Sequence, residues 1–479
     1  MASNLPDYVA SAQPVPQANR IPWFSSTAQT YAGIMLWFVF WHEIPIGKTL
    51  NAGEPFSMFP GGTLAQGIGV AILGVVLAAL ICHFLFYVVP GLLGMKTGLP
   101  LYIVGTSTYG VRGGFLMPGF LMGVLQFGWL GVNSYFSAML LASTCGYDVN
   151  GMLHMTIGVI WAIVAAFVGL KGIQYVAKIA TFLPVIPFVI LLVLFANTCG
   201  GIANFDSQAL VKAGEAHLQT VNAENVVSPL SMFGVIAVIC TYIVGFFATA
   251  GAAGVDFGMN NRDAKDVQLG GLIGIAGSTI FTGVLAILII AGIYGAGNAE
   301  GYSAELNVVG QVSNVFGDGM VKIFMILLAV AAFPPACFAS FIAANSFKTT
   351  LPKVNPFISV GLGTLGSIVL VVTAKAGNAA GVFTIIGASF GPICGAMMAD
   401  YLLAGKKWAG PRAGFNPAGW ISWAVGFVVG ISGNLPYLSQ IYNPCPPVTA
   451  FIVGFVLYII LAKAGLESKK LEMPAAEAE

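Results

Sequence analysis

The chain contains 479 residues, of which 57% are hydrophobic and only 8% are charged, and its formal net charge is +1. Because soluble domains carry roughly 25% charged residues, this composition excludes an ordinary soluble enzyme and predicts a protein with many membrane spans, whose first partner is the lipid bilayer. The nearly neutral charge balance says nothing about nucleic acid, and no basic patch stands in the sequence to suggest such a partner.

Twelve apolar stretches follow one another along the chain, and each is long enough to cross a bilayer as a helix. In order, spans 1 to 12 cover residues 27–47, 65–90, 113–144, 152–170, 173–197, 229–257, 269–296, 318–347, 357–374, 379–404, 413–433 and 446–465. The polar segment 1–26 has no apolar centre, which indicates a cytoplasmic N-terminus rather than a signal peptide. The predicted fold class is an all-α polytopic membrane protein with twelve transmembrane helices.

The positive charges predict the orientation. If the N-terminus is cytoplasmic, four lysines lie outside (Lys48, Lys212, Lys322 and Lys375), whereas the other fifteen of the nineteen Lys and Arg residues lie inside or near the inner interface. Positive residues favour the cytoplasmic side of a membrane. We therefore expect a cytoplasmic membrane protein with both termini in the cytoplasm.

The first ten spans divide into two sets of five, and an odd-numbered set must invert when it is repeated. Inverted repeats are a recurrent plan in secondary transporters. The expected organisation is a first repeat at 27–197, an outer polar loop at 198–228, a second repeat at 229–404, two further helices at 405–466 and a polar, disordered cytoplasmic tail at 467–479.

Span 6 contains the stretch Val244–Phe257, which reads VGFFATAGAAGVDF. Its three glycines, Gly245, Gly251 and Gly254, have two interpretations. They let neighbouring helices approach closely, or they mark a broken helix whose free backbone groups hold a substrate.

Three polar or aromatic residues of span 3, Gln126, Trp129 and Asn133, are spaced three and four apart and therefore share one helical face. Amides beside an indole suit a flat polar heterocycle better than a sugar or an ion. Phe247 of span 6 is expected to supply the opposing ring, and Thr249 a hydroxyl. The alternative is a ladder of hydrogen bonds between helices, without a ligand.

Several motifs together resemble the nucleobase:cation symporter-1 family, the group of cytosine, allantoin and hydantoin permeases. They are PVPQANR (14–20), MKTGLP (95–100), YGVRGGFLMPG (109–119), LQFGWLGV (125–132), the span 6 stretch above and IIGASFGPICGAMMADYLL (385–403). The match covers nearly the whole chain, and the motifs stand in the same order as in the family.

The resemblance implies a five-plus-five inverted-repeat bundle with two extra C-terminal helices, acting as a permease that imports a planar heterocycle by alternating access. It implies that the substrate lies between Trp129 and Phe247, with amide contacts from Gln126 and Asn133. It further implies a hydroxyl contact from Thr249 and backbone contacts from the region of Gly33 to Trp37 in span 1.

Span 8 departs from the family at two places. Pro335 aligns where cytosine permeases carry an asparagine that binds the base. Ala331 and Ala332 align where sodium-coupled members offer hydroxyl groups. The identity of the base therefore stays open, and a local break is expected at Pro334–Pro335, since each proline removes a donor.

The coupling ion, a proton or sodium, is also left open, and no other cofactor or metal is expected. Lys178 of span 5 is the candidate for coupling, because a lysine inside a membrane span marks a functional site by default. In this hypothesis its ammonium replaces the ion, and transport is coupled to protons or uncoupled. In the competing hypothesis Lys178 reaches the inner interface, and sodium binds through carbonyls and Ser340.

Two further residues of span 1, His42 and Glu43, either gate the pathway and relay protons or reach the outer interface. Three cysteines near one membrane face, Cys145, Cys199 and Cys445, leave the question of disulfide pairing open. No nucleophile triad, phosphate loop or metal-ligand spacing stands in the sequence, so we expect a transporter, as a monomer, and not an enzyme.

Two alternatives remain at this stage. One is an amino-acid permease of the same architecture, which the stacking pair disfavours because an amino acid need not carry a flat ring. The other is a channel or receptor built on a transporter-like bundle. A channel would repeat a polar ring across several spans, whereas the polar residues here concentrate on spans 1, 3 and 6.

Overall fold

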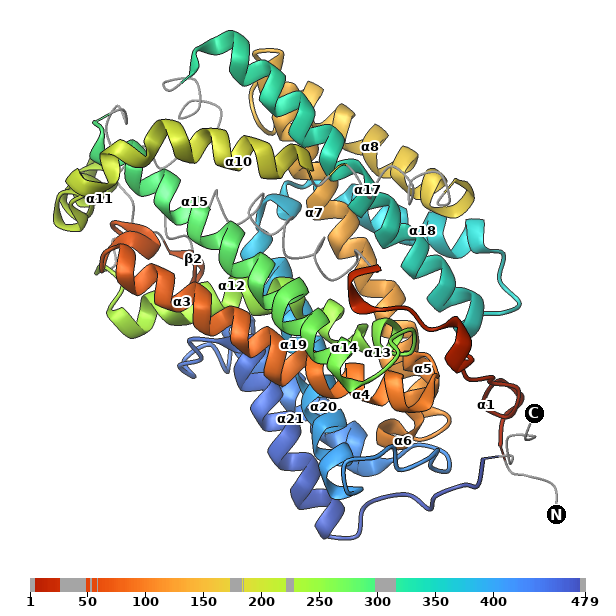
Figure 1. The fold of residues 1–479 in the computed structure, drawn as a ribbon. Helices are drawn as coiled ribbons and strands as arrows, with labels where there is room; N and C mark the ends of the chain where they lie inside the picture. The colour runs from red at the N-terminus through yellow and green to blue at the C-terminus, as the bar shows by residue number, and fades with distance from the viewer. Residues whose placement is uncertain are drawn as a thin grey trace.

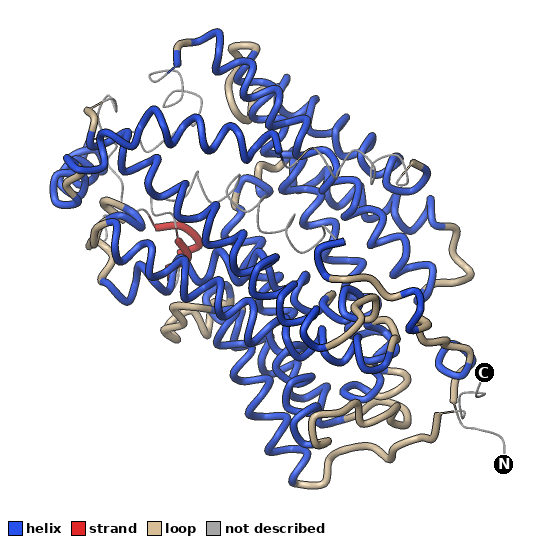
Figure 2. The backbone as a smooth tube through the Cα atoms, viewed as in Figure 1, coloured by secondary structure: helices blue, strands red, loops and turns tan. Residues whose placement is uncertain are grey.

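The computed structural model describes residues 5–25, 49–51, 54–57, 59–172, 183, 185–220, 228–297 and 316–473. In this part of the chain the regular structure is helical, apart from one antiparallel pair of strands, β1 (Thr49–Asn51) and β2 (Glu54–Ser57) (Figure 2). The prediction of an all-α membrane protein is confirmed at this level.

Nine of the described helical segments are long and apolar enough to cross a membrane. They are Ile68–Thr97, Phe115–Thr144, Met152–Lys171, Val185–Asn204, Met232–Ala252, Ala264–Gly295, Gly319–Lys348, Gly381–Leu403 and Pro446–Lys463, and two shorter apolar helices are Pro356–Val372 and Pro417–Gly430. These segments overlap predicted spans 2 to 12, because a buried or lipid-facing helix keeps a continuous apolar sequence. Of span 5, residues 173–182 and 184 lie outside the described residues. Span 1 lies outside the described residues.

The helices of the first half are α1 (Asp7–Ala10), α3 (Ile68–Ile81), α4 (Val88–Thr97), α5 (Leu101–Val104), α6 (Thr106–Tyr109), α7 (Leu121–Thr144), α8 (Met152–Lys171), α10 (Val185–Thr198) and α11 (Ser207–Thr220). Those of the second half are α12 (Met232–Ala252), α13 (Gly254–Gly258), α14 (Ala264–Leu269), α15 (Ser278–Gly295), α17 (Asp318–Thr350), α18 (Pro356–Val372), α19 (Ala379–Leu403), α20 (Pro417–Gly430) and α21 (Pro446–Lys463). π-Helical turns at Cys82–Tyr87, Phe115–Phe120 and Gly270–Gly277 join neighbouring helices.

The helices form two packed groups (Figure 1). In the first group α7 packs against α8, α17 and α18 around a small core of its own. In the second group α12 lies against α3 and α19, and α19 also packs against α20 and α21. The helix that carries the glycine-rich stretch is therefore central to the second group.

Two glycines of α12 lie where neighbouring helical segments of the same chain approach closely. A Cβ atom at Gly245 would lie 2.7 Å from the carbonyl oxygen of Phe383 in α19, and one at Gly251 would lie 2.7 Å from the Cβ atom of Phe86. No larger residue fits such a contact, so these glycines permit close helix packing.

The same stretch also interrupts its helix. α12 ends at Ala252, and α13 begins at Gly254 after a single turn residue, Ala253. The close-packing interpretation is confirmed for Gly245 and Gly251. The interruption is slight, because the N–H of Ala253 donates to the carbonyl of Thr249 and its own carbonyl accepts from the N–H of Phe257. A broken helix that holds a substrate stays a prediction.

The break expected at Pro334–Pro335 does not occur, and this prediction is wrong. α17 continues from Asp318 to Thr350 with both prolines inside it. The prolines remove two backbone donors, but contacts with α7 and α8 along the helix hold it together.

The 198–228 segment, expected to be a polar loop, contains the helix α11. Leu210 and Val211 are buried, with 4% and 7% exposure, and a methyl group of Val211 lies against Gly61. The rest of the helix is mostly polar, so α11 is an amphipathic helix whose short apolar face docks on the protein. The mixed composition of this stretch, which is polar overall, does not distinguish a short amphipathic helix from a loop.

The segment after α21, expected to be disordered, is ordered at least to residue 473. The backbone N–H of Ala413 donates to the carbonyl of Lys469 over 2.9 Å, and the backbone N–H of Leu471 donates to the carbonyl of Pro411 over 2.8 Å. The tail therefore pairs with the loop between α19 and α20. The prediction failed because the composition of a short polar segment does not show its backbone partners.

The N-terminal PVPQANR motif docks on the MKTGLP motif. The backbone N–H of Val15 donates to the carbonyl of Gly98 over 2.9 Å, and the guanidinium of Arg20 donates to the carbonyl of Met95 over 2.6 Å. Gly98 has a φ of +66°, which favours glycine. These two motifs thus form one structural unit at the end of α4.

Candidate functional site

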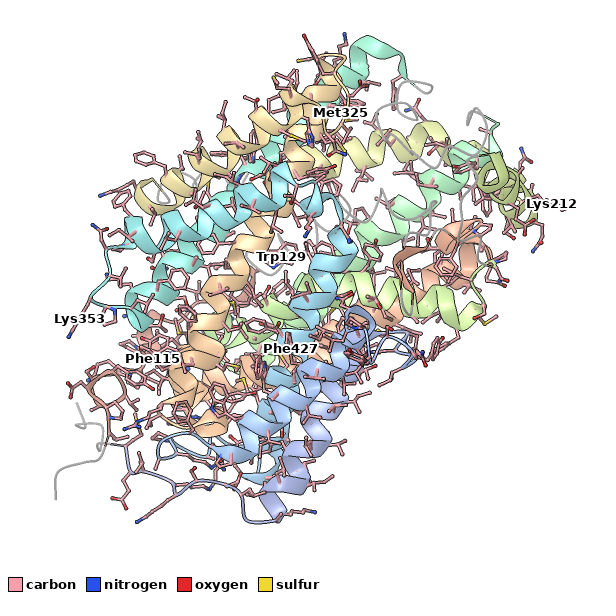
Figure 3. The ribbon with its side chains drawn as sticks, turned by 180° about the vertical axis from the view of Figure 1, so that it is seen from behind. Phe115, Trp129, Lys212, Met325, Lys353 and Phe427 are labelled. Atoms are coloured by element: carbon pink, nitrogen blue, oxygen red, sulfur yellow. The ribbon has the colours of Figure 1, made fainter. Side chains whose placement is uncertain are left out.

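Trp129 of α7 lies where three helices meet (Figure 3). The centroid of its ring is 4.8 Å from that of Phe246 in α12, with an interplanar angle of 83°, and 5.0 Å from that of Phe383 in α19, with an angle of 31°. Phe246 and Phe383 also pack edge to face, with their ring centroids 5.6 Å apart. Trp129 therefore connects the first packed group of helices to the second.

A fourth ring completes this set. The ring centroids of Tyr242 in α12 and Phe383 are 6.3 Å apart, and the two ring planes make an angle of 87°. We call Trp129, Tyr242, Phe246 and Phe383 the aromatic cluster. Edge-to-face pairs of this kind favour a fixed arrangement of the rings, because the electropositive edge of one ring meets the electronegative face of the next.

The indole nitrogen of Trp129 is buried and has no hydrogen-bond partner among the described residues. Buried N–H groups in native proteins nearly always have an acceptor. Residues 26–48, which contain span 1, lie outside the described residues and could include its acceptor.

Asn133 has both ends of its amide engaged within the protein. Its nitrogen donates to the carbonyl of Ala332 in α17 over 2.9 Å, and its oxygen accepts from the indole N–H of Trp161 in α8 over 3.2 Å. The alternative from the sequence, a hydrogen-bond ladder between helices, accounts for this residue. It fixes α7 to α8 and α17.

Gln126 has a weaker partner. The side chain is 6% exposed, and its nitrogen donates to the sulfur of Met122 over 3.5 Å. A thioether is a poor acceptor. Of the two amides on the predicted face of α7, Gln126 is therefore the one that can exchange its partner for a stronger acceptor on a ligand.

The face of α12 that meets Trp129 carries Thr249. Phe246 and Thr249 are three residues apart, and Tyr242 lies four residues before Phe246, so all three share one side of the helix. Phe247 is buried, with 4% exposure, and lies on the side of Gly251, which packs on Phe86. The ring that Trp129 meets is thus Phe246, not the predicted Phe247.

Five predicted site residues lie outside the described residues: Gly33, Trp37, His42, Glu43 and Lys178. Their roles stay predictions. Ser340 is described, and its hydroxyl donates to the carbonyl of Ala336 within α17 over 3.5 Å. It is fully buried against Gly169 of α8.

Phe246 and Phe383 are functional candidates that the sequence did not identify. Of two adjacent phenylalanines, the sequence alone cannot tell which one turns toward α7. A signal did exist, since Tyr242, Phe246 and Thr249 follow the helical i, i+4, i+7 spacing. Phe383 stands just before the motif 385–403 and carried no pattern of its own.

A buried ion-pair network around Arg412 is a further feature that the sequence analysis does not predict. The guanidinium of Arg412 lies 2.9 Å from the carboxylate of Asp400 and 2.6 Å from that of Glu467. The hydroxyl of Ser107 donates to Asp400 over 2.5 Å. The network joins α6, α19 and the tail after α21, which assigns it a structural role.

Metal ligands do not gather in the part of the chain that the structure describes. There, no group of three or more His, Cys, Asp and Glu side chains could hold a metal ion. Free cysteines include Cys145, Cys199 and Cys445, so none of these forms a disulfide.

Residues 57–457 match a family described as permease for cytosine/purines, uracil, thiamine, allantoin. The cytosine permease of Escherichia coli strain K12 is 25% identical to the chain over 358 residues, which cover 74% of this chain and 75% of the relative. Cytosine permeases of two other E. coli strains match to the same extent.

Solved structures show the same fold. The inward-facing conformation of Mhp1 aligns with a TM-score of 0.66 at 17% identity, covering 98% of this chain and 97% of that one. Mhp1 in a closed conformation with bromovinylhydantoin bound aligns with a TM-score of 0.59 over 95% of both chains. A Na⁺-coupled sialic acid symporter aligns with a TM-score of 0.57 at 14% identity, covering 95% of this chain and 92% of that chain.

Proposed function

Because the chain belongs to the family of permeases for cytosine/purines, uracil, thiamine and allantoin, we propose that it carries a nucleobase or a related planar nitrogen heterocycle across a membrane as a secondary transporter. The observation that carries the proposal is the position of Trp129, in a cluster of rings from α7, α12 and α19. Permeation of such a molecule requires a site shared between groups of helices that can move apart.

In this proposal the substrate stacks on the indole of Trp129, while the amide of Gln126 and the hydroxyl of Thr249 bond its edges. Stacking of a flat base on an aromatic side chain contributes about 1–3 kcal/mol. The indole N–H lies in the plane of the ring, so a stacked substrate cannot accept its hydrogen. A variant with phenylalanine at this position therefore separates stacking from hydrogen bonding.

The architecture in this proposal is a twelve-helix bundle with two inverted five-helix repeats and both termini in the cytoplasm. Its support is the partition of Lys and Arg residues and the likeness to Mhp1 over nearly the whole chain.

For coupling we propose a proton or no ion, with Lys178 as the resident cation. Sodium prefers several hard oxygen ligands, whereas Ala331 and Ala332 of α17 carry none on their side chains and are buried. The carbonyl of Ala332 already accepts from Asn133. In proteoliposomes, uptake that depends steeply on a sodium gradient and is unchanged by Lys178→Ala would contradict this part of the proposal.

A ligand screen tests the substrate class. Ligands that bind only the folded state raise its melting temperature. We expect cytosine, purines, uracil, hydantoins or allantoin to stabilise the purified protein, and matched uncharged sugars to leave it unchanged. Stabilisation by aliphatic amino acids, with none by any of the heterocycles, would favour the amino-acid permease instead.

A further inference from the structure

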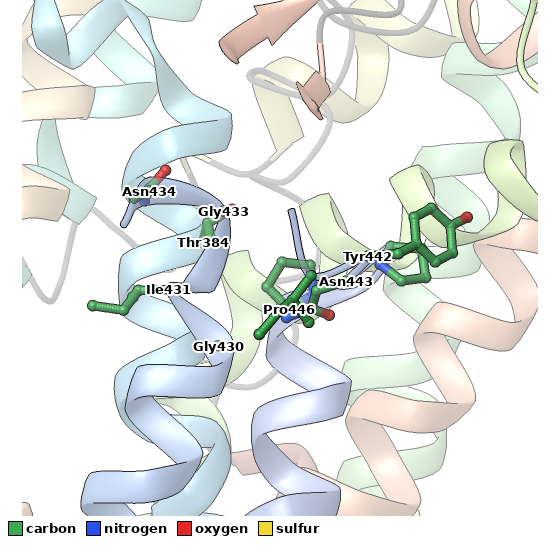
Figure 4. A pocket seen from close by; sticks show the side chains of 10 residues that line it. Thr384, Gly430, Ile431, Gly433, Asn434, Tyr442, Asn443 and Pro446 are labelled. Carbon is green, nitrogen blue, oxygen red and sulfur yellow. The ribbon is translucent and has the colours of Figure 1, made fainter. Parts of the chain in front are cut away.

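A small pocket lies where the start of α19, the end of α20 and the start of α21 meet (Figure 4). Its walls come from Thr384 of α19, Gly430 of α20, Pro446 of α21 and parts of the segment 431–444 between the last two helices. The volume of the cavity is about 70 Å³. A cavity of about 150 Å³ binds benzene, so this one suits a few water molecules or a small ion rather than a planar ring.

Close contacts between the three helices fix the walls of this pocket. A Cβ atom at Gly387 of α19 would lie 2.5 Å from Cγ of Pro447 in α21. A Cβ atom at Gly430 of α20 would lie 2.5 Å from Cβ of Ala388 in α19. Thr384 precedes Gly387 by three residues and Ala388 by four, so the three share one face of the helix. Thr384 is therefore on the face of α19 that meets α20 and α21.

Two residues that line the pocket have a buried side-chain oxygen with no hydrogen-bond partner among the described residues. The atoms are Oγ1 of Thr384, a residue that is 2% exposed, and Oδ1 of Asn443. The amide nitrogen of Asn443 donates to the carbonyl of Val429 in α20 over 2.9 Å, which fixes the orientation of the amide. Because buried polar groups nearly always have a partner, the two oxygens indicate a binding site for a small species.

The surroundings of the pocket favour a positive charge. The C-terminal end of α20 reaches the pocket at Gly430, and the carbonyl groups of a helix end carry a partial negative charge. In contrast, α21 begins with Pro446 and Pro447, which have no N–H groups to offer an anion.

The lining also distinguishes between cations. None of the described residues that line the pocket carries a carboxylate or a basic group. A calcium ion would therefore lack the carboxylates that usually bind it. Neutral oxygens are sufficient for an alkali cation, as in the selectivity filters of potassium channels.

We propose that this pocket binds one sodium or potassium ion, with Oγ1 of Thr384 and Oδ1 of Asn443 as its side-chain ligands. The carbonyl end of α20 supplies further oxygens, since helix C-terminal ends bind such ions in transporters. The ion links the ends of α19, α20 and α21. This site is separate from the sodium position considered at Ser340 of α17, and it is independent of which substrate is transported.

Thermal unfolding of the purified full-length protein tests the proposal, because a ligand of the folded state raises the melting temperature. The protein is titrated with sodium chloride or potassium chloride, and N-methyl-D-glucamine chloride keeps the ionic strength constant. We expect at least one of the two alkali ions to raise the melting temperature as its concentration increases. Thr384→Val, which replaces the hydroxyl by a methyl group, should weaken the apparent affinity for that ion about 10-fold.

Thr449→Val is the matched control for this substitution. The hydroxyl of Thr449 already donates to the carbonyl of Cys445 at the start of α21 over 3.1 Å, so this variant should keep the wild-type affinity. An ion-dependent shift that Thr384→Val retains in full belongs to another site and would overturn the proposal. Equal melting temperatures in alkali ions and in N-methyl-D-glucamine would also overturn it.

A second measurement needs no variant and decides the question even if Thr384→Val folds poorly. Crystals of the wild-type protein are soaked in thallium(I), which substitutes for alkali cations and scatters anomalously. We expect an anomalous peak within the pocket, beside Thr384 and Asn443. An ordered water only at this place, with no anomalous peak, would contradict the proposed ion site.

Discussion

The side-chain amide of Asn133 in α7 donates a hydrogen bond of 2.9 Å to the backbone carbonyl of Ala332 in α17. The same amide accepts from Trp161 of α8. Three helices of the first packed group are thus held by one polar side chain. The neighbouring substrate candidate on α7, Gln126, donates to the sulfur of Met122, a weak acceptor, and is the better placed of the two to bind a ligand.

This relationship gives the first prediction. We expect Asn133→Ala to lower the free energy of unfolding by about 1 kcal/mol, the usual scale for hydrogen bonds between membrane helices, and to leave substrate affinity nearly unchanged. Thermal unfolding and equilibrium binding of the same purified protein measure the two effects. A well-folded variant that loses affinity would instead support the direct contact that the sequence predicts.

The second prediction concerns the buried ion pair between Arg412 and Asp400. Arg412→Ala leaves the Asp400 carboxylate, 3% exposed, without its cation, and breaking a buried pair typically costs about 3–5 kcal/mol. Glu467→Gln is the matched control, because the Glu467 side chain is 29% exposed and should lose far less. Melting temperatures of the three proteins in one detergent provide the comparison, and equal losses from both substitutions would contradict it.

The third prediction is a pH dependence at Asp256, in the short helix α13. Burial raises the pKa of Asp256 from its ordinary value of 3.8 to about 6, and a hydrogen bond from the backbone N–H of Leu101 partly opposes this shift. The folded state therefore holds the proton more tightly than the unfolded state, so this residue's contribution to stability falls as the pH rises from about 4 to about 7.

Asp256→Asn keeps an acceptor for Leu101 and cannot ionise. Melting curves of the wild type and of Asp256→Asn should coincide near pH 4, and the variant should become progressively the more stable protein toward pH 7. A constant difference across this range would show that ionisation of Asp256 does not influence folding.

The fourth prediction tests the orientation. Gln208 of α11 is exposed and belongs to the segment between the proposed repeats. In a background without other reactive cysteines, Gln208→Cys should react with an impermeant maleimide on intact cells, because the proposed topology places it outside. If labelling requires lysis of the cells, the proposed orientation is wrong.

The sequence predicts the helical spans well and their contacts poorly. Apolar length is a local property, so eleven of the twelve predicted spans overlap described apolar helices. The shared face of Gln126, Trp129 and Asn133 follows from helical spacing alone. By contrast, the pairing of Arg412 with Asp400 and of the tail with Pro411 depends on which distant segments meet, and no local pattern encodes that.

The same distinction explains the errors in the predicted site. The sequence places an aromatic ring opposite Trp129 on the correct helix but chooses Phe247 over Phe246, since one residue on a helix turns the side chain by about 100°. It expects a break at Pro334–Pro335 because proline removes a donor, yet packing against α7 and α8 maintains α17 as one helix.

The most direct test of the account is the affinity of Trp129 variants for the best heterocycle from the ligand screen. We predict that Trp129→Ala binds about 10-fold or more weakly, given a stacking contribution of about 1–3 kcal/mol and roughly 1.4 kcal/mol per decade. Trp129→Phe, which keeps a ring but no N–H, should retain most of the affinity. Wild-type affinity in a folded Trp129→Ala protein would contradict the central claim and remove the aromatic cluster from the site.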